Sequence, residues 1–252
     1  MTPVDRSTVS RPDRPECKTP RLLDFHTHRT GCEYYRGTDT IIVQSTYLSE
    51  EPCPRADYYT TGIHPMEVEE AKQVLGRGVE YLREVIFAKR EQTSAPLLAL
   101  GELGWDNRSS GLSLSEQSKL VSWQLDLAEE LGLPVVFHIV GGWDLLLAEQ
   151  RSRTRHTAWW VHGFRGKPGL LDQLRRAGIS VGLSPRYTWG SCPEPGSFLL
   201  ETDEEIGTLA ESYRRAGIAL GMRPDLLAHH LLSTFAELVE RHHLPLSRSL
   251  CL

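Results

Sequence analysis

The side chains best suited to chemistry in this chain are imidazoles and carboxylates that stand near the ends of short apolar segments. His26 and His28 stand two residues apart at the end of the first such segment, and single histidines or acidic residues close several later ones. Such groups bind Zn²⁺, Mn²⁺, Ni²⁺ or Mg²⁺, and the lack of a cysteine among them disfavours a closed structural zinc. We predict a centre that could hold two divalent ions if one carboxylate bridges them, made from His26, His28, Glu102, His138, His162 and Asp203.

The spacing within the first segment supports this interpretation. Side chains alternate along a strand, so Asp24, His26 and His28 are expected to point the same way, with Asp24 one layer deeper in a structural role. Glu201 and Asp203 repeat this spacing later in the chain. A single histidine on a strand is usually a hydrogen-bonded core residue, whereas so many metal-type residues at strand ends are hard to explain by packing alone.

Apolar runs alternate with longer amphipathic stretches after Pro20, a pattern typical of β/α units. Strands are expected at about 21–28, 40–47, 57–64, 96–104, 133–140, 157–163, 178–184 and 197–203. Helices are expected at about 67–91, 113–131, 143–150, 168–177, 204–216 and 224–241. This order predicts a TIM-type (β/α)8 barrel, whose outer helix ring is left incomplete by short links after the first, second and seventh strands. The carboxyl ends of all strands meet on one face of such a barrel, so the proposed ligands would converge there.

Length and composition fit one such barrel and argue against other classes of protein. The chain has 252 residues, of which 40% are hydrophobic, enough for one large core. Its net charge of −5 argues against a nucleic-acid binder driven by global charge, and no apolar run is long enough to span a membrane. Five scattered cysteines without a C-x-x-C pair suggest free thiols and a cytoplasmic location. Residues 1–20 are expected to form a disordered leader and residues 21–252 a single hydrolase domain, with no signal for an oligomeric state.

Several short motifs follow one another in a specific order. They are D-F-H-T-H at 24–28, G-I-H-P at 62–65, G-E-L-G-W-D at 101–106 followed by Gln117, L-P at 133–134 before His138, H-G-F at 162–164 and L-E-T-D at 200–203. Their order and spacing resemble those of the TatD family of metal-dependent hydrolases, known chiefly as deoxyribonucleases, over about residues 21–240.

The resemblance implies a barrel with two divalent ions bridged by Glu102, and a substrate phosphate contacted by His64. One ion would be bound by His26, His28 and Asp203, and the other by His138 and His162. The chain departs from the main branch of the family, where an arginine follows the fifth-strand histidine two residues on and a proline-containing segment follows the E-T-D. Here Val140 and Glu204-Glu205-Ile206 stand at those places, and the stretch from His162 to Lys167 is similar to a shorter bacterial branch.

Hydrolysis fits these residues, because two ions can activate a water molecule and neutralise the charge that builds on a phosphoryl or carbonyl oxygen. Asp203 is the candidate general base, and Glu102 is the second catalytic carboxylate. Arg165 and Lys167 directly follow the sixth strand and could hold the oxygens of a phosphodiester. Residues 151–176 contain seven Lys or Arg residues against one acidic residue, which could equally form a solvated face.

Three functions fit the sequence. The basic residues beside the centre favour a phosphodiesterase or deoxyribonuclease that acts on DNA or RNA ends or on a small phosphodiester. The low global charge suits a small or single-stranded substrate better than wrapped duplex. An amidohydrolase-like enzyme acting on an amide, ester or lactone would not need these cations, and a metal-binding protein without turnover would need only the ligands.

Overall fold

Eight parallel strands form the centre of the structure, a computed structural model that describes residues 21–29, 34–35, 38–154, 157–189, 193–194, 196–204 and 208–245. They lie in the order β1 to β8, and each pairs in parallel with the next. The strands are β1 (Leu22–Thr27), β2 (Thr40–Thr46), β3 (Tyr58–Thr61), β4 (Leu97–Asp106), β5 (Val135–Val140), β6 (Trp159–Val161), β7 (Ile179–Leu183) and β8 (Phe198–Leu200). Each lies within or close to a segment that the sequence predicts as a strand.

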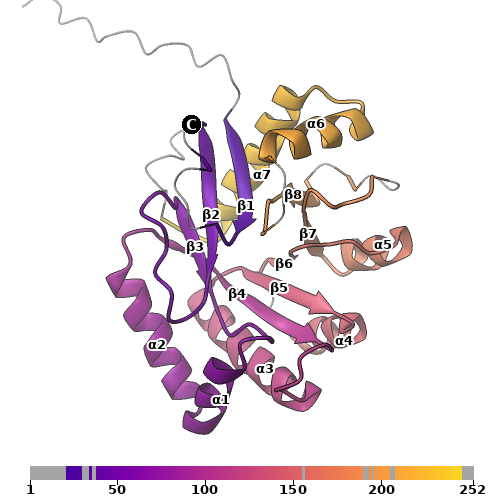
Figure 1. Ribbon diagram of the computed structural model, residues 1–252. Coiled ribbons are helices and arrows are strands. Elements are labelled where there is room, and N and C mark those ends of the chain that lie inside the picture. Colours follow the sequence, from indigo (N-terminus) through magenta and orange to yellow (C-terminus); the bar gives the residue numbers. More distant parts are fainter. Residues whose placement is uncertain are drawn as a thin grey trace, which may run out of the picture.

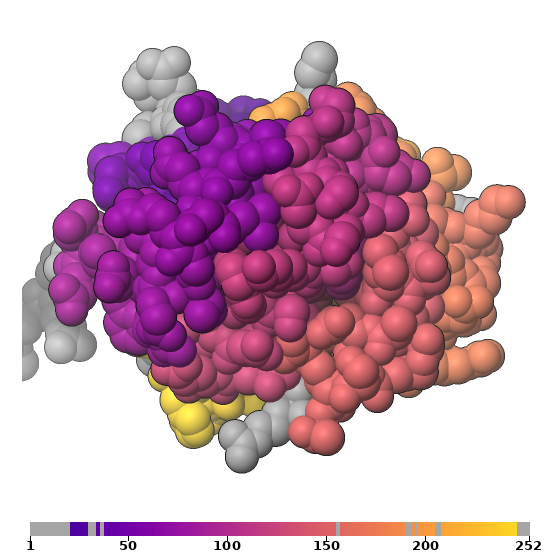
Figure 2. Space-filling view, turned by 90° about the horizontal axis from the view of Figure 1, so that it is seen from below, coloured from indigo at the N-terminus to yellow at the C-terminus, as the bar shows by residue number. Residues whose placement is uncertain are grey.

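Helices surround these strands (Figure 1). They are α1 (Val68–Arg77), α2 (Val79–Gln92), α3 (Leu114–Leu131), α4 (Trp143–Ser152), α5 (Pro168–Arg176), α6 (Leu209–Leu220) and α7 (Pro224–Arg241). Viewed from below, the purple surface of the first third of the chain adjoins the magenta and salmon surface of the segments that carry β4 to β6 (Figure 2). The link between β2 and β3, residues 47–57, contains no helix, as expected for an incomplete outer ring.

The ends of the sheet meet at a short seam that nearly closes the barrel. Thr27 and Asp203 form a parallel bridge, in which the Asp203 N–H donates to the His26 carbonyl at 2.9 Å. Farther down β1, the hydroxyl of Tyr213 in α6 bonds to both the N–H and the carbonyl of Leu23, each at 3.1 Å. The predicted TIM-type barrel is therefore confirmed.

Two predicted helices have different bounds in the structure. The helix expected at 67–91 is split into α1 and α2 by Gly78, whose φ of 92° lies in a region that favours glycine. The helix expected at 204–216 begins only at Leu209, because the Thr208 hydroxyl caps it by accepting from the Glu211 N–H at 3.2 Å. The start of α3 agrees with prediction, since Ser113 and Glu116 form a capping box.

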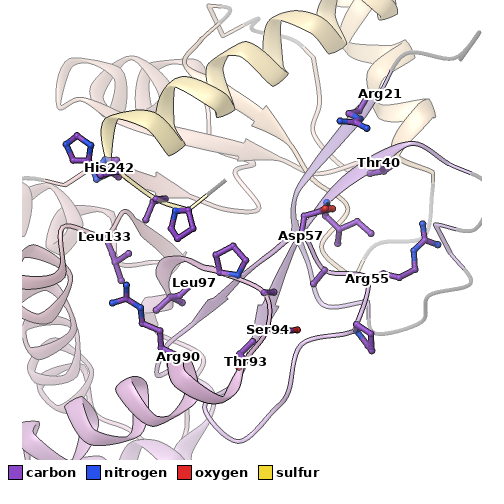
Figure 3. Close-up of a pocket in the computed structure, with 18 of the residues that line it drawn as sticks. Arg21, Thr40, Arg55, Asp57, Arg90, Thr93, Ser94, Leu97, Leu133 and His242 are labelled. Carbon is purple, nitrogen blue, oxygen red and sulfur yellow. Dashed lines mark hydrogen bonds between the residues drawn. The ribbon is translucent and has the colours of Figure 1, made fainter. Parts of the chain in front are cut away.

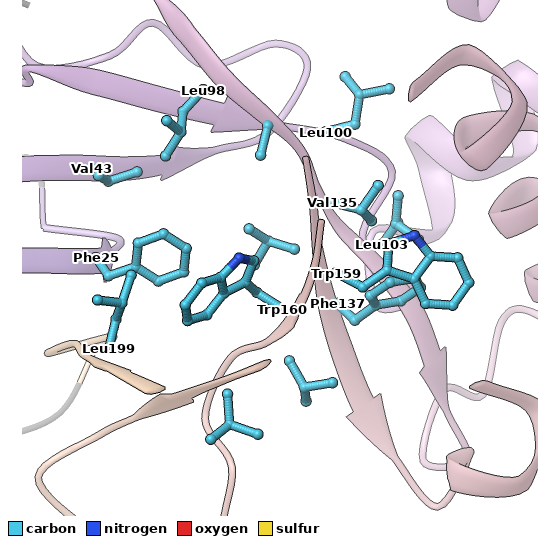
Figure 4. Packing of buried hydrophobic residues seen from close by; sticks show 14 of the residues in the cluster. Phe25, Val43, Leu98, Leu100, Leu103, Val135, Phe137, Trp159, Trp160 and Leu199 are labelled. Atoms are coloured by element: carbon cyan, nitrogen blue, oxygen red, sulfur yellow. The ribbon is translucent and has the colours of Figure 1, made fainter. Parts of the chain in front are cut away.

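The core includes large side chains that meet inside the barrel (Figure 4). Phe25 of β1 packs on Trp160 of β6 with ring centroids 4.9 Å apart. The pairing of β1 with β2 shifts register between Asp24 and Thr27, which interrupts the strict alternation expected for this strand. Phe25 therefore fills the barrel below the histidines that follow it.

A large hollow of about 890 Å³ opens at the end of the barrel where the strands begin (Figure 3). Its lining includes Thr40 and Leu97, the first residues of β2 and β4, together with Arg90 and His242. None of the proposed metal ligands lines it. The predicted site therefore belongs to the opposite face, where the strands end.

The predictions on the N-terminal segment, the domain bounds and the cellular location have the following outcomes. Residues 1–20, expected to form a disordered leader, lie outside the described residues, so that prediction and the single domain at 21–252 stay predictions. Within the described ranges, every helix is too short or too polar to cross a bilayer. A cytoplasmic location also stays a prediction.

Candidate metal centre

The carboxylate of Glu102 lies at the centre of the cluster predicted from the sequence. Its Oε1 is 2.6 Å from Nε2 of His28 and 3.3 Å from Nε2 of His26. Its Oε2 is 2.5 Å from Nε2 of His162 and 3.4 Å from Nδ1 of His138. The two oxygens thus face two different pairs of imidazoles, as a bridging carboxylate would.

The proposed ligands lie at or just after the carboxyl ends of their strands. His26 and Glu102 lie in β1 and β4, His138 lies in β5, and His162 directly follows β6. Asp203 follows β8, and its Oδ1 is 3.9 Å from Nε2 of His28. The backbone of Asp203 has a φ of 52°, a left-handed conformation that Asp tolerates better than most residues. All six proposed ligands therefore come together in the structure.

The donor set fits a divalent ion. Both ring nitrogens of His26 are buried and make no hydrogen bond to any residue that the structure describes, which is costly for a polar group unless it binds something. Three sets of side chains have ligand atoms within 4.8 Å of one another: His26, His28 and Glu102; His26, His162 and Asp203; and His64, Glu102 and His138. These overlapping sets of imidazole and carboxylate match the chemistry of Zn²⁺, Mn²⁺ or Ni²⁺.

The charges of the cluster are strongly coupled. Burial would raise the pKa of Glu102, but the imidazoles of His162 and His26 hold it well below its ordinary value. Burial would lower the pKa of His28, but the hydrogen bond and charge of Glu102 raise it to about 9. Burial lowers the pKa of His64 to about 4, so this ring is neutral at physiological pH. Glu102 therefore keeps its negative charge despite complete burial.

Asp106 is a functional candidate that the sequence analysis did not assign. Its Oδ2 lies 3.0 Å from Nε2 of His138, whose Nδ1 faces Glu102. Arg108 grips the same carboxylate, with Nε 2.9 Å from Oδ1 and Nη2 2.5 Å from Oδ2. Burial would raise the pKa of Asp106, but the hydrogen bonds from Arg108 and His138 depress it. Asp106 thus has the place of the carboxylate that commonly orients a metal-binding histidine.

Glu201 stands on the other side of His162. Its Oε1 accepts from the Gly163 N–H at 2.6 Å and lies 3.9 Å from Nδ1 of His162. Burial and the charge of Asp203 raise its pKa well above the ordinary value. A Cβ atom at Gly182 would approach Oε2 of Glu201 to 1.9 Å, so any larger residue there would require this carboxyl group to move. Glu201 is therefore a buried neighbour of the centre rather than one of the grouped ligands.

Asp24 lies where β1 meets the segment after β8. Its carboxylate accepts hydrogen bonds from the Tyr35 hydroxyl at 2.6 Å and from the Thr202 N–H and hydroxyl at 2.8 and 2.7 Å. The expected structural role is therefore one of joining β1 to the segment after β8. The register shift within β1 accounts for the difference from simple alternation.

The second strand also reaches the centre, although the sequence analysis gave it no part there. The Ser45 hydroxyl donates to Oε1 of Glu102 at 3.1 Å. The ring of Tyr47 lies 6.0 Å from that of His28 and 6.4 Å from that of His64. The position of Ser45 and Tyr47 near the end of a predicted strand is the sequence feature that places them near the centre. Serine and tyrosine are too common at such positions for this feature to predict a role.

The residues proposed to bind substrate have different places around the centre. Nε2 of His64 is 3.7 Å from Oε2 of Glu102, so this ring is part of the cluster. Arg165 lines a hollow of about 410 Å³ beside the centre, which Arg108 and Trp143 also border. Lys167 is exposed just before α5 and does not line that hollow. The structure thus places His64 and Arg165 near the ligands, and Lys167 farther out.

Comparison with known proteins adds a family. A family model described as TatD related DNase matches residues 26–204. An Escherichia coli K12 protein named uncharacterized metal-dependent hydrolase YjjV is 26% identical over 155 residues, which cover 58% of this chain and 57% of the relative. A protein of Musicola paradisiaca named 3'-5' ssDNA/RNA exonuclease TatD is 27% identical over 135 residues, which cover 53% of this chain and 48% of the relative. The chain therefore spans about half the length of the curated relatives it matches.

Solved structures resemble the whole barrel. A hydrolase of the TatD family from Entamoeba histolytica superposes with a TM-score of 0.63 at 13% identity, covering 87% of this chain and 98% of that one. The Escherichia coli YjjV structure gives a TM-score of 0.61 at 21% identity, with 86% and 97% covered. At these identities the likeness concerns the fold.

Proposed function

The chain belongs to the TatD-related DNase family, and we propose that it is a metal-dependent phosphodiesterase that cleaves single-stranded DNA or RNA. The relatives named as exonucleases support the reaction type. The observation that carries the proposal is the place of Glu102, between two pairs of imidazoles and next to a hollow lined by two arginines.

We propose two divalent ions that share Glu102. His26, His28 and Asp203 would hold one, and His138 and His162 the other. The division is supported by the distances to Glu102, because Oε1 faces the histidines of β1 whereas Oε2 faces those of β5 and β6. Bound ions of this kind lower the pKa of a water molecule and neutralise charge that builds on a phosphoryl oxygen.

The chain itself would orient the substrate and move the proton. The Asp203 side chain is 18% exposed and borders both the ligands and the hollow, so it can accept a proton from water. His64 is neutral because burial lowers its pKa to about 4. It can therefore donate one hydrogen bond to a phosphate oxygen without adding charge.

Arg165 distinguishes a phosphodiester from an uncharged substrate. A phosphodiester is negative in both ground and transition states, so a cation at the mouth binds it throughout the reaction. An amide, ester or lactone has no such charge. The position of Arg165 in the lining beside His162 and Asp203 therefore favours a phosphodiester over the amidohydrolase alternative.

Cleavage assays with and without a chelator test the proposal. Metal-loaded protein is expected to degrade a single-stranded oligonucleotide, and chelation should abolish this. Arg165→Ala should retain its metal but lose about 1.5–3 kcal/mol in kcat/KM, an effect that shrinks as salt rises. Asp203→Asn should lower turnover by about 10²-fold or more. Hydrolysis of neutral esters or lactones that is indifferent to Arg165, without oligonucleotide cleavage, would overturn the proposal in favour of the amidohydrolase alternative.

A further inference from the structure

The hollow beside the metal centre has an aromatic wall as well as a cationic one. It measures about 410 Å³ and borders His138, His162 and Asp203. The indole of Trp143 forms part of its lining and is only half-buried. The Trp143 ring meets the ring of Phe164 edge-on, with centroids 5.9 Å apart and planes at 78°. An aromatic face held in this way is suited to stacking with another ring.

Two glycines bring Trp143 to this position. Gly141 has a φ of 78°, and a Cβ there would lie 2.2 Å from Nδ2 of Asn107. A Cβ at Gly142 would lie 2.5 Å from Cβ of Trp105. The end of β5 can therefore run against the end of β4, where Asp106 and Gly141 form an antiparallel bridge. As a result, α4 starts with Trp143 only five residues after the metal-ligand candidate His138.

Two guanidinium groups border the same hollow. The side chain of Arg108 is 63% exposed, and its bonds to Asp106 use Nε and Nη2. Its Nη1 makes no hydrogen bond within the described part of the chain and can still donate. Arg165 contributes a second guanidinium from the segment after β6. Guanidinium groups bind phosphate oxygens in a fork, and an aromatic ring near them offers a surface for a base.

We infer that this hollow is a nucleotide subsite, in which the base at the end of a single strand stacks on Trp143 while Arg108 and Arg165 hold its phosphate. The inference rests on the proposed phosphodiesterase function. It adds recognition of the base, which the metal centre itself does not contact. Every base has a flat aromatic face, so stacking tolerates any sequence. A paired base is already stacked within its duplex, and the subsite therefore favours unpaired ends.

The test compares the binding of two oligonucleotides that differ only in whether their terminal residues carry a base. One single-stranded oligonucleotide carries normal nucleotides at its ends, and a second carries abasic residues there. Phosphorothioate linkages slow cleavage so that binding to the metal-loaded full chain can be measured by fluorescence anisotropy. Trp143→Ala should weaken binding of the first oligonucleotide by about 5- to 100-fold and leave binding of the second unchanged. Trp143→Phe should restore most of the affinity, because its ring still stacks.

Trp123→Ala is the matched control. Trp123 is a half-buried tryptophan of α3 whose ring is contacted by Lys119, and it does not line the hollow. This variant should bind both oligonucleotides like the wild type. Equal losses for both oligonucleotides in Trp143→Ala would overturn the subsite, because Trp143 would then act only through packing on Phe164. Base-dependent binding without cleavage of unmodified DNA or RNA would instead support the subsite and overturn the proposed reaction.

Discussion

Neighbouring residues of the centre shift one another's pKa values and so set one another's charge. Glu102 is buried, yet the surrounding imidazoles keep its pKa well below the ordinary value. In return, Glu102 overcomes the effect of burial and raises the pKa of His28 to about 9. A histidine binds a metal ion through a neutral nitrogen, so protons and ions compete for His28. The same carboxylate thus stabilises either a protonated imidazole or a divalent cation beside it.

Asp106→Asn tests whether the hydrogen bond between Nε2 of His138 and Asp106 orients the His138 ring for metal binding. The hydrogen bond of 3.0 Å from Nε2 to Asp106 fixes the tautomer in which Nδ1 is open toward Glu102. Replacing the carboxylate by an amide should lower divalent-metal affinity by about 10- to 100-fold. Competition with a chromogenic chelator would measure this directly. Asp225→Asn, which changes an exposed partner of Arg223, should leave the affinity unchanged. If Asp106→Asn binds metal as tightly as the wild type, other contacts orient His138.

Whole strands could be placed from the sequence, because each apolar run stops at a polar residue. The alternation of a strand also puts Asp106 on the same side of β4 as Glu102, four residues earlier. The spacing within the G-E-L-G-W-D motif therefore indicates Asp106 as well as Glu102. The position of His64 at the end of a predicted strand placed it with the other strand-end histidines, and the family resemblance gave it a role in binding the substrate.

Contacts between elements far apart in the chain could not be predicted in this way. The Gln124 side chain of α3 accepts from the Ile63 N–H at 2.7 Å, next to His64, across 61 residues of sequence. The register shift in β1 and the approach of β4 to Gly141 depend in the same way on three-dimensional packing. The role of Trp143 could not be predicted for the same reason, since its position at the start of a helix says nothing about the hollow that it lines.

Gly182→Ala tests how closely β7 and the segment after β8 must approach. The added Cβ would lie 1.9 Å from Oε2 of Glu201 and 3.3 Å from Cα of His162, so the buried carboxyl must move. We expect a loss of about 1–3 kcal/mol in the free energy of unfolding, together with weaker metal binding through displacement of His162.

Gly169→Ala is the matched control for Gly182→Ala. This glycine lies in α5, and a Cβ there would have no described residue within 4 Å apart from its chain neighbours and the backbone of its own helix. The substitution should leave metal binding unchanged and raise the free energy of unfolding by about 0.5–1 kcal/mol, because alanine favours the helix. Urea unfolding and chelator competition measure both effects. Unchanged stability and metal binding in Gly182→Ala would show that Glu201 has room to move without affecting His162.

The barrel as a whole is completed by a seam that uses side chains as well as backbone. Thr27 and Asp203 pair directly, while Tyr213 supplies hydrogen bonds to Leu23 at the beginning of β1. Between these points, Asp24 binds both the N–H and the hydroxyl of Thr202. The proposed ligands on β1 and after β8 are neighbours because of this seam. Its stability therefore bears on the metal centre and on the fold together.

Asp24 makes the stability of this seam depend on pH. Burial raises the pKa of Asp24 from 3.8 to about 6, although the hydrogen bonds from Tyr35 and Thr202 oppose the shift. A carboxyl group whose pKa is raised by folding stabilises the protein below its unfolded value of 3.8, where it is neutral in both states. As the pH rises from 3.8 to about 6, the unfolded chain releases the proton first, and this stability is lost.

Comparison with Asp24→Asn isolates the effect, because an amide does not titrate. Urea unfolding of both proteins in chelator, at intervals from pH 4 to pH 7, gives the difference in free energy of unfolding between wild type and variant. The protonation of the histidine cluster is common to both proteins and cancels in this difference. We expect this difference to fall by about 2 kcal/mol between pH 4 and pH 7, less than the full equivalent of a shift of about two pKa units, because more than half of the unfolded Asp24 is already ionised at pH 4. A difference that stays flat or grows with pH would mean that the three hydrogen bonds outweigh burial, and that Asp24 joins the two ends of the barrel as a carboxylate at every pH.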